Sequence, residues 1–292
     1  MKPSMAPLAV LAASALWASS GLAVSLGHLS AAPTSVAATR LVFGGLAMAF
    51  IAKLGRTRQA WRRLNGRAIV QAVLGMALFQ WTFFASVPHV GVGLASLLPS
   101  LLAPLAAEAL AVAHPVHARP SRAWGSIGIL LVGAALLYRS LEAVGLFLSV
   151  AAGVSYAFYA DATKSVQRDH NDPADGLAIT AVALLGAGVA LLPMVGPNLH
   201  VALSWRDLVV GIYLALPATA LAYAIFATAL RHLSSAEALS LVTIPPSIGF
   251  ILEVLLAPAP MPWSALCGLL VLGAPLAVRS AIPRLTRLFR PA

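Results

Sequence analysis

Charged side chains are scarce in this sequence: Asp, Glu, Lys and Arg make up only 10% of its 292 residues, whereas 60% of the residues are hydrophobic. A soluble domain carries about 25% charged residues. The chain therefore has too few charges to cover a water-facing surface, which excludes an ordinary soluble enzyme or binding domain. Acidic residues are the rarest, with 9 Asp and Glu against 19 Lys and Arg, so the net charge is +10.

Cysteine and metal-binding patterns are also nearly absent. The single cysteine, Cys267, excludes an intramolecular disulfide and a cysteine metal cluster. The 7 histidines fall in predicted loops or at helix ends, and no two of them have metal-ligand spacing within one helix. The sequence contains neither GxxxxGKS nor GxxxxGKT, the phosphate-binding motif of many ATPases. We therefore expect no metal, no cofactor and no enzymatic activity.

Long apolar runs, in contrast, are abundant. A helix of about 20 residues rises about 1.5 Å per residue and crosses a hydrocarbon core of about 30 Å. We predict ten such helices, over residues 6–26, 34–54, 68–87, 92–112, 123–138, 143–163, 174–195, 207–230, 236–257 and 262–282. These segments lack the period-2 alternation of a membrane barrel strand. The predicted fold class is an all-α membrane protein with ten transmembrane helices.

The basic residues are distributed unevenly over the predicted loops. If the N-terminus is cytoplasmic, all of the 19 Lys and Arg residues except Arg40, Arg139 and Arg206 fall on the inner side. An excess of Lys and Arg in short loops is typical of the cytoplasmic side. The distribution predicts cytoplasmic N- and C-termini. We expect a multi-pass protein of a bacterial inner (plasma) membrane. The positive charge thus indicates topology and contact with the lipid bilayer, and we expect no nucleic-acid partner.

The two halves of the chain, residues 1–140 and 141–292, resemble each other weakly. "SALWAS" (14–19) corresponds to "GVSYAF" (153–158), Arg139-Ser140 corresponds to Arg279-Ser280, and Pro104 corresponds to Pro246 at nearly the same separation. Each half holds five predicted helices, and an odd number makes the second repeat enter the membrane from the opposite side. Inverted repeats are typical of secondary transporters that alternate between inward-open and outward-open states. Channels and membrane enzymes carry repeats too.

Prolines interrupt the fourth helix of each half. A proline removes a backbone donor and frees a carbonyl, and interrupted helices at matching positions are a pointer to a central binding site. A plain packing kink is the alternative. The substrate-binding candidates from these breaks and the small polar residues beside them are Ser96, Pro99, Ser100, Thr243, Pro246 and Ser247. For each hydroxyl, local capping of the broken turn is the alternative to a ligand role.

Aromatic and amide side chains gather in the middle of other predicted helices. Trp17 and Tyr156 occupy matching positions of the two halves, and Trp81 and Tyr223 nearly do. A buried indole or phenol needs a hydrogen-bond partner, so a substrate cavity is a reasonable destination, with plain packing as the alternative. The substrate-binding candidates of this group are Trp17, Phe79, Gln80, Trp81, Tyr156 and Tyr223.

Ionisable residues inside membrane spans are costly and are candidates for function. Arg40 and Glu253 are predicted at a similar depth near the outer side and could pair with each other; alternatively, Arg40 could bind a substrate carboxylate, or both could reach the interface. Arg40, Glu108, Asp161 and Glu253 are the gating or coupling candidates, with solvation at a helix mouth as the alternative for Glu108 and Asp161. Glu237 has a structural explanation, because Ser234-Ser235-Ala236-Glu237 is a capping box.

"ALRHLSSAEA" (229–238) followed by Pro246 is similar to a pattern of the EamA-type carriers in the drug/metabolite transporter superfamily, and "SALWAS" and "TRLVFGGL" (39–46) fit the same family. The resemblance covers nearly the whole chain. It implies an inverted-repeat fold of ten helices, a central cavity and secondary transport, with YddG-type amino-acid exporters as the first comparison. The chain departs from the family where many members have Gly-Glu after the fourth-helix proline, since His117 and Ala259 stand there.

These observations predict a secondary transporter that exports a small organic solute, most readily an amino acid, by alternating access. A multidrug efflux carrier of the same fold, a channel and a lipid flippase are the alternatives. The expected partners are the small-molecule substrate and the lipid bilayer. The sequence leaves open whether the protein is a monomer or a homodimer.

Overall fold

The structure is a computed structural model that describes residues 1–27, 33–54, 58–110, 142–170, 172–195 and 205–246. Within these residues every regular element is a helix and no strand occurs. The elements are η1 (Pro3–Met5), α1 (Ala6–Gly27), α2 (Pro33–Leu54), α3 (Arg58–Arg63), α4 (Gly66–Leu110), α6 (Ala143–His170), α7 (Pro173–Val195), α8 (Trp205–Ala215), η3 (Leu216–Leu221), α9 (Ala222–Leu230) and α10 (Ser235–Val242).

Six helical stretches of this part of the chain are long and apolar enough to cross a membrane. They are Ser35–Ala52, Gly66–Gly91, Gly93–Leu110, Ala143–Arg168, Ala174–Val195 and Trp205–Leu230. The prediction of an all-helical membrane protein is therefore confirmed for the described residues. The fifth and tenth predicted helices, over 123–138 and 262–282, lie outside these residues, as do Ser247, Glu253 and Cys267.

The predicted third and fourth helices are joined in α4 across a sharp break at Gly91. Gly91 has φ 78° and ψ 165°, in the left-handed region that favours glycine because a Cβ would clash there. The backbone conformation of Gly91 thus separates the two predicted spans without an intervening loop. The sixth predicted helix, over 143–163, extends in the structure to His170. The additional residues are mostly polar and continue the helix beyond the apolar run.

Local capping explains where several helices begin. Asp172 precedes Pro173 at the start of α7, and its carboxylate accepts a hydrogen bond from the Ala174 amide at 2.9 Å. At the start of α10 the Glu237 amide donates to the Ser234 hydroxyl at 3.2 Å, and the Glu237 carboxylate accepts from the Ser234 amide at 2.8 Å. The predicted capping box is thus confirmed.

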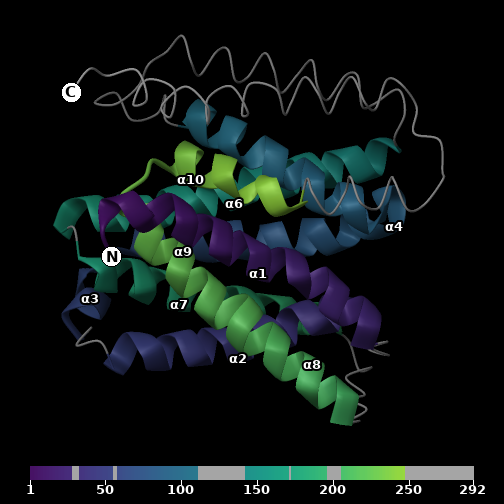
Figure 1. Ribbon diagram of the computed structural model, residues 1–292, viewed down its shortest axis with the longest axis horizontal. Helices are drawn as coiled ribbons and strands as arrows, with labels where there is room; N and C mark the ends of the chain where they lie inside the picture. The colour runs from purple at the N-terminus through teal and green to yellow at the C-terminus, as the bar shows by residue number, and fades with distance from the viewer. Residues whose placement is uncertain (28–32, 55–57, 111–141, 171, 196–204, 247–292) are drawn as a thin grey trace.

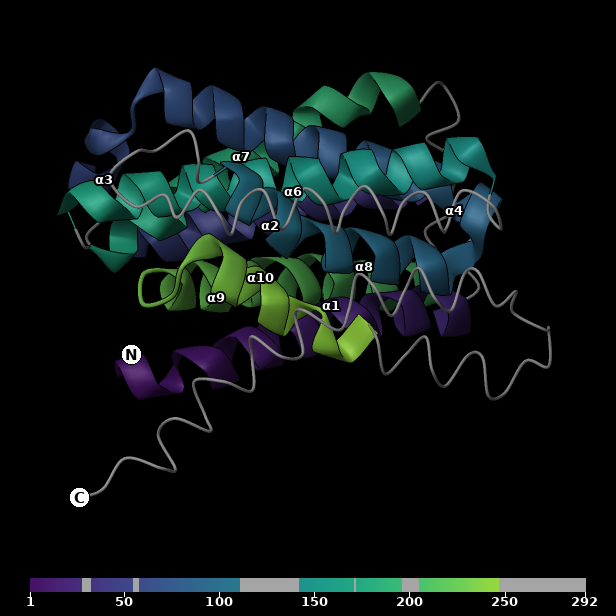
Figure 2. The ribbon, with the colours of Figure 1, turned by 90° about the horizontal axis from the view of Figure 1, so that it is seen from above.

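The helices run roughly along the long axis of the molecule, and helices from the two halves of the chain pack against each other (Figures 1 and 2). α2 packs along α7, α4 packs along α6, and α1 lies against α8, η3, α9 and α10. Small residues allow the close approach of α2 and α7: a Cβ on Gly188 would come within 2.8 Å of the Val42 amide nitrogen. Such contacts are typical of packed membrane helices.

A single π-helical turn separates α8 from α9. This turn, η3, contains Pro217, which lacks the N–H of a regular helix. The Thr219 hydroxyl donates to the Leu214 carbonyl at 2.7 Å and so satisfies a backbone acceptor in the buried turn. The extra residue rotates the following turns, and these carry Tyr223 and Phe226 to the centre of the bundle.

Candidate functional site

Six aromatic rings from four helices meet in the interior of the bundle, and we call them the aromatic cluster. Its members are Trp17 of α1, Phe79 of α4, Tyr156 and Tyr159 of α6, and Tyr223 and Phe226 of α9. The Trp17 ring lies 4.7 Å from Tyr223 and 5.3 Å from Phe226 between centroids. Tyr159, Tyr223 and Phe226 are almost completely buried, and they are among the largest buried side chains. The cluster is therefore an interior wall built by both halves of the chain.

Four of the predicted substrate-binding residues lie together in this cluster: Trp17, Phe79, Tyr156 and Tyr223. Tyr159 and Phe226 join them, although their positions alone did not distinguish them as ligands. Phe79 and Tyr156 lie 4.8 Å apart, and Tyr156 stacks on Tyr159 at 5.8 Å. Helices of different halves thus contribute rings that contact one another directly.

Several polar groups of the cluster have partners inside the protein. The Tyr159 and Thr180 hydroxyl oxygens are 3.1 Å apart. The Tyr223 hydroxyl donates to the Met76 sulfur at 3.6 Å, and the buried Gln80 amide approaches the same sulfur at 4.0 Å. A thioether is a weak acceptor, and Tyr223 also has a side-chain hydrogen bond with Gln80.

Three predicted site residues each carry a buried polar atom that has no hydrogen-bond partner among the residues that the structure describes. The atoms are Trp17 Nε1, Arg40 Nε and the Tyr156 hydroxyl oxygen, and all three are buried. An unpaired buried polar group costs about 1–3 kcal/mol, and a charged one costs more. Trp17 contacts the Tyr156 ring at 6.1 Å and the Tyr223 ring at 4.7 Å between centroids. Trp17 and Tyr156 thus lie side by side with their polar atoms unpaired, and a bound molecule could supply the missing partners.

The interrupted part of the fourth predicted helix is buried against α6. Pro99, Ser100 and Pro104 are all buried, and Ser96 is half-buried. The Ser100 hydroxyl donates to the Leu97 carbonyl at 2.8 Å. This contact is the local capping that was the alternative to a ligand role for Ser100. A Cβ on Gly153 would lie 3.0 Å from the Pro99 carbonyl oxygen. This break therefore permits a close approach between α4 and α6.

A side chain of α1 binds a backbone carbonyl at the break in the ninth predicted helix. Because Pro246 has no N–H, the carbonyl of Val242 loses its regular helical donor. The Ser14 hydroxyl donates to this carbonyl at 2.8 Å. Thr243 is also engaged locally, since its hydroxyl donates to the Ser240 carbonyl at 2.7 Å. Ser14 was not among the predicted site residues, although it lies one helical turn before Trp17 on α1.

The remaining candidates lie away from the aromatic cluster. The Trp81 side chain is 39% exposed on the surface of the bundle, and none of the ring contacts between described residues involves it. Asp161 accepts a hydrogen bond from the Gln71 amide at 3.4 Å, and Glu108 is half-buried near the end of α4. Roles for Trp81, Asp161 and Glu108 stay predictions. Among the described residues, no group of three or more His, Cys, Asp or Glu could hold a metal ion.

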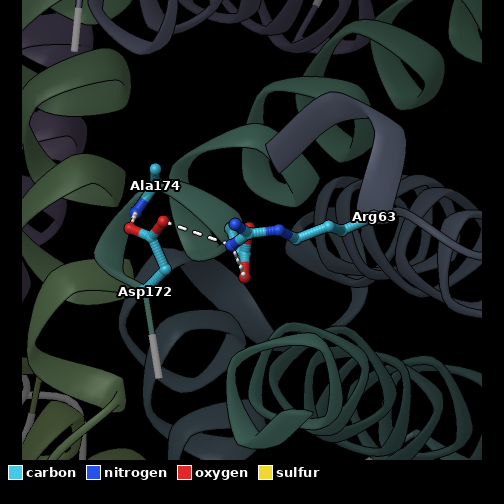
Figure 3. Close-up of polar contacts among 4 residues, drawn as sticks. Arg63, Asp172 and Ala174 are labelled. Atoms are coloured by element: carbon cyan, nitrogen blue, oxygen red, sulfur yellow. Dashed lines mark hydrogen bonds and ion pairs between the residues drawn. The ribbon is translucent and has the colours of Figure 1, made fainter. Parts of the chain in front are cut away.

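An ion-pair network that the sequence did not predict joins the two halves at the end of the bundle near α3. The Arg63 guanidinium lies 3.3 Å from Asp172 and 3.4 Å from Asp175, whose side chain is fully buried (Figure 3). Arg63 is the last residue of α3, which follows α2, and both aspartates lie at the start of α7. The network therefore holds α3 against α7, which also packs along α2.

The other end of the bundle has a weaker polar contact. His89, beside the Gly91 break, lies 2.8 Å from the Glu142 carboxylate at the start of α6, and both side chains are substantially exposed.

An apolar groove lined by Ala47, Phe50, Leu216, Pro217 and Leu221 runs between α2 and η3. It holds no charged side chain and is separate from the aromatic cluster, so it offers no group that could select a polar solute.

Comparisons with known proteins agree with this architecture. The chain matches the EamA-like transporter family twice, over residues 4–139 and 143–278. It is 27% identical over 294 residues to the uncharacterized transporter YwfM of Bacillus subtilis (strain 168), with 97% of this chain and 96% of that protein covered. A protein of known crystal structure is similar with a TM-score of 0.66 and 18% identity, over 98% of this chain and 99% of the other; this likeness shows the fold alone.

Proposed function

The chain belongs to the EamA-like transporter family, and we propose that it is a secondary transporter that exports a small organic solute, an amino acid, across a bacterial inner membrane. The aromatic cluster, in which Trp17 and Tyr156 each keep an unpaired buried polar atom, is the observation that carries this proposal. A packed core of purely structural origin pairs its buried polar groups. Here Trp17 and Tyr156, whose buried polar atoms are unpaired, contact each other, and a solute could supply their partners.

Alternating access follows from which helices hold the cluster. α1 and α4 come from the first half of the chain, whereas α6 and α9 come from the second. A movement of one half relative to the other would separate the Trp17 ring from Tyr223 and Phe226 and open the cluster. We propose that the halves are two inverted repeats of five helices each, ten helices in total.

The placement of the basic residues supports the proposed orientation. Lys164 donates hydrogen bonds to the carbonyls of Leu230 and Arg231 at 2.8 and 3.0 Å, so the α9–α10 turn lies beside the end of α6. Arg63 contacts the α6–α7 turn at the same end of the bundle. Basic residues thus gather at one end, which is the end that Lys- and Arg-rich loops would place in the cytoplasm. Both termini are cytoplasmic in this proposal.

Counterflow measurements test the transport proposal. The full-length protein is reconstituted into proteoliposomes loaded with one unlabelled amino acid, and entry of the labelled form is followed across a panel of amino acids. We expect saturable counterflow for at least one of them. A second series, with and without an imposed proton gradient, tests whether protons drive net movement.

The other candidate functions give distinct results. A channel predicts flux that never saturates, and a flippase predicts movement of labelled lipid without movement of amino acids. A multidrug carrier predicts saturable transport of apolar cations that tolerates Gln80→Ala and Arg40→Ala. Each of these results would reject the proposal that the protein is an amino-acid carrier. Empty liposomes reconstituted in parallel give the background flux.

A further inference from the structure

We propose that the two halves of the chain rock about the crossing of α2 and α7 during transport, and that this crossing stays closed while contacts away from it open in turn. This inference rests on the proposed function and adds the pivot of the movement. It starts from two buried glycines, Gly45 of α2 and Gly188 of α7, at which the backbones of the two helices approach each other.

The crossing is made by two contacts that are copies of each other. A Cβ on Gly45 would lie 2.8 Å from the Leu185 amide nitrogen, and a Cβ on Gly188 would lie 2.8 Å from the Val42 amide nitrogen. Gly188 follows Gly45 by 143 residues, and Leu185 follows Val42 by the same number. The glycine of each helix therefore meets the residue that stands three positions before the glycine of the other helix.

The buried faces of the two helices repeat at the same separation. They include Ala38, Leu41 and Met48 on α2 and Ala181, Leu184 and Leu191 on α7. Contacts in which each partner presents the same patch to the other are typical of a two-fold axis. The contacts are antiparallel, because the residue number rises along α2 as it falls along α7. The axis that would relate two inverted repeats therefore passes through this crossing.

Contacts away from the crossing also occur as a related pair. The Ser19 and Tyr213 hydroxyl oxygens are 2.5 Å apart between α1 and α8. Between α4 and α6, the Gln71 amide donates to the Phe158 carbonyl at 3.2 Å. Phe158 follows Ser19 by 139 residues, which is also the separation of the two family matches, and Tyr213 follows Gln71 by 142 residues. The separation is larger after the first helix of each half, because α6 is longer than α1.

The crossing and the related pair respond differently to alternating access. In a transporter of inverted repeats, the inward-open and outward-open states are related by exchanging the conformations of the two repeats. This exchange returns the α2–α7 crossing to itself, so both states can keep the same partners there. It replaces the α1–α8 contact by the α4–α6 contact, so these two contacts can open in opposite states. The crossing is therefore the place about which the halves can rock without losing a contact.

Matched glycine variants test whether the crossing is reciprocal. Gly45→Ala and Gly188→Ala each place a Cβ 2.8 Å from a backbone nitrogen. Each should lower the Tm in detergent by a similar amount, about 3–10 °C, because neither backbone can move without the other. Gly211→Ala of α8 is the control, because a Cβ there would meet nothing within 4 Å, and its Tm should not fall. A lower Tm in only one of the two crossing variants overturns the inference.

Cross-links between the halves test the movement itself. They are made in a Cys267→Ala background, which removes the single cysteine of the chain and serves as the reference. Val42→Cys with Gly188→Cys allows a disulfide at the crossing, where a Cβ on residue 188 would lie 2.8 Å from the Val42 Cγ2 atom. Ser19→Cys with Tyr213→Cys, bridged by a short bifunctional thiosulfonate, links α1 to α8. Maleimide labelling of the remaining thiols measures how far each link has formed.

The two links should affect counterflow differently. We expect the crossing disulfide to leave counterflow within about twofold of the reference, and the α1–α8 link to lower it at least about tenfold until the link is reduced. Loss of counterflow on closing the crossing disulfide would show that the crossing must open. Unchanged counterflow with α1 linked to α8 would show that the halves do not part there. Either result overturns the inference.

The pivot and the transport proposal fail in different ways. If the first crossing pair does not fold, Gly45→Cys with Leu185→Cys is its counterpart at the same crossing and carries the same expectation. If the reference protein carries no solute, the transport proposal fails, while the glycine variants still decide whether the crossing is reciprocal. If solute is carried and the crossing disulfide stops it, the transporter stands and the pivot fails.

Discussion

The centre of the bundle and its α3 end treat polar groups in opposite ways. At the α3 end, Arg63 bridges Asp172 and the fully buried Asp175, and Asp172 also caps α7. At the centre, Trp17 Nε1 and the Tyr156 hydroxyl are buried without a partner among the described residues. Unpaired groups lower stability, so their presence at the centre indicates that something other than stability maintains them. We infer that the end supports the fold and the centre binds the solute.

The largest expected effect separates two tryptophans. Trp17→Ala removes the ring that contacts Tyr156, Tyr223 and Phe226. We expect counterflow kcat/KM to fall by at least about 100-fold, because both a wall and a donor of the site are lost. Trp81→Ala is the matched control, because its ring is 39% exposed and lies away from the cluster; it should keep roughly wild-type transport.

Equal losses in both tryptophan variants, with the protein correctly folded, would contradict this distinction. Folding is checked by size-exclusion elution and by thermal stability in detergent. Truncating a buried aromatic costs about 3–5 kcal/mol, so Trp17→Phe provides a variant that keeps most of the packing. It should retain the fold and still lose transport efficiency.

The second prediction concerns the α3 end. Arg63→Gln removes the positive charge that lies 3.4 Å from the buried Asp175 carboxylate in the wild type. We expect a loss of about 1–3 kcal/mol in stability, measured as a lower Tm in detergent, with the order of preference among amino acids unchanged. Arg62→Gln is the matched control, since Arg62 is exposed in the same short helix, and it should leave the Tm close to that of the wild type.

A double variant sharpens this test. Arg63→Gln combined with Asp175→Asn also removes the buried negative charge that Arg63 faces, so it should be more stable than Arg63→Gln alone. A changed preference among amino acids in Arg63→Gln would show that the end also takes part in recognition, which would remove the contrast between the two regions.

The sequence predicted these two regions unequally, for physical reasons. Apolar length predicts spans, and Ser234 with Glu237 predicts a cap, because both are local properties. The face of a membrane helix is different. Lipid and protein interior are about equally apolar, so a helix such as residues 68–87 shows little contrast between its buried and lipid-facing sides. This is why Trp17 and Trp81 could not be distinguished before the packing was known.

Contacts between distant helices were also beyond local patterns. Proline at position 246 predicts a freed carbonyl, but no sequence pattern indicates which hydroxyl will bind it. The structure supplies Ser14 of α1, whose hydroxyl donates to Val242 at 2.8 Å. The same limit applies to Arg63, whose partners lie on another helix of the other half. Both contacts depend on how the two halves pack.

The third prediction tests the Ser14 contact. Ser14→Ala leaves the Val242 carbonyl without a donor in a buried region, and we expect a loss of about 1 kcal/mol in stability, seen as a lower Tm. Ser240→Ala is the control, because the Ser240 hydroxyl donates within its own helix to the Ala236 carbonyl. That variant should change stability by less than about 0.5 kcal/mol. Equal effects would show that the α1–α10 contact contributes no more than a local one.

The smallest expected effect compares two stacked tyrosines of α6. The Tyr159 hydroxyl is paired with Thr180 at 3.1 Å, whereas the Tyr156 hydroxyl is buried without a described partner. Tyr159→Phe should lower stability by about 1 kcal/mol, because it leaves Thr180 with one partner fewer. Tyr156→Phe removes an unpaired polar atom, so the stability should stay equal or rise by up to about 1 kcal/mol.

Transport should respond in the opposite order. If the Tyr156 hydroxyl is left unpaired in order to donate to the solute, Tyr156→Phe raises the KM for counterflow by about 3- to 10-fold, whereas Tyr159→Phe leaves the KM nearly unchanged. Tm and KM are measured on the same preparations, so one variant that gains stability and loses affinity cannot be explained by misfolding. A Tyr156→Phe variant that loses stability would show that the hydroxyl has a structural partner, and the centre would then resemble the α3 end.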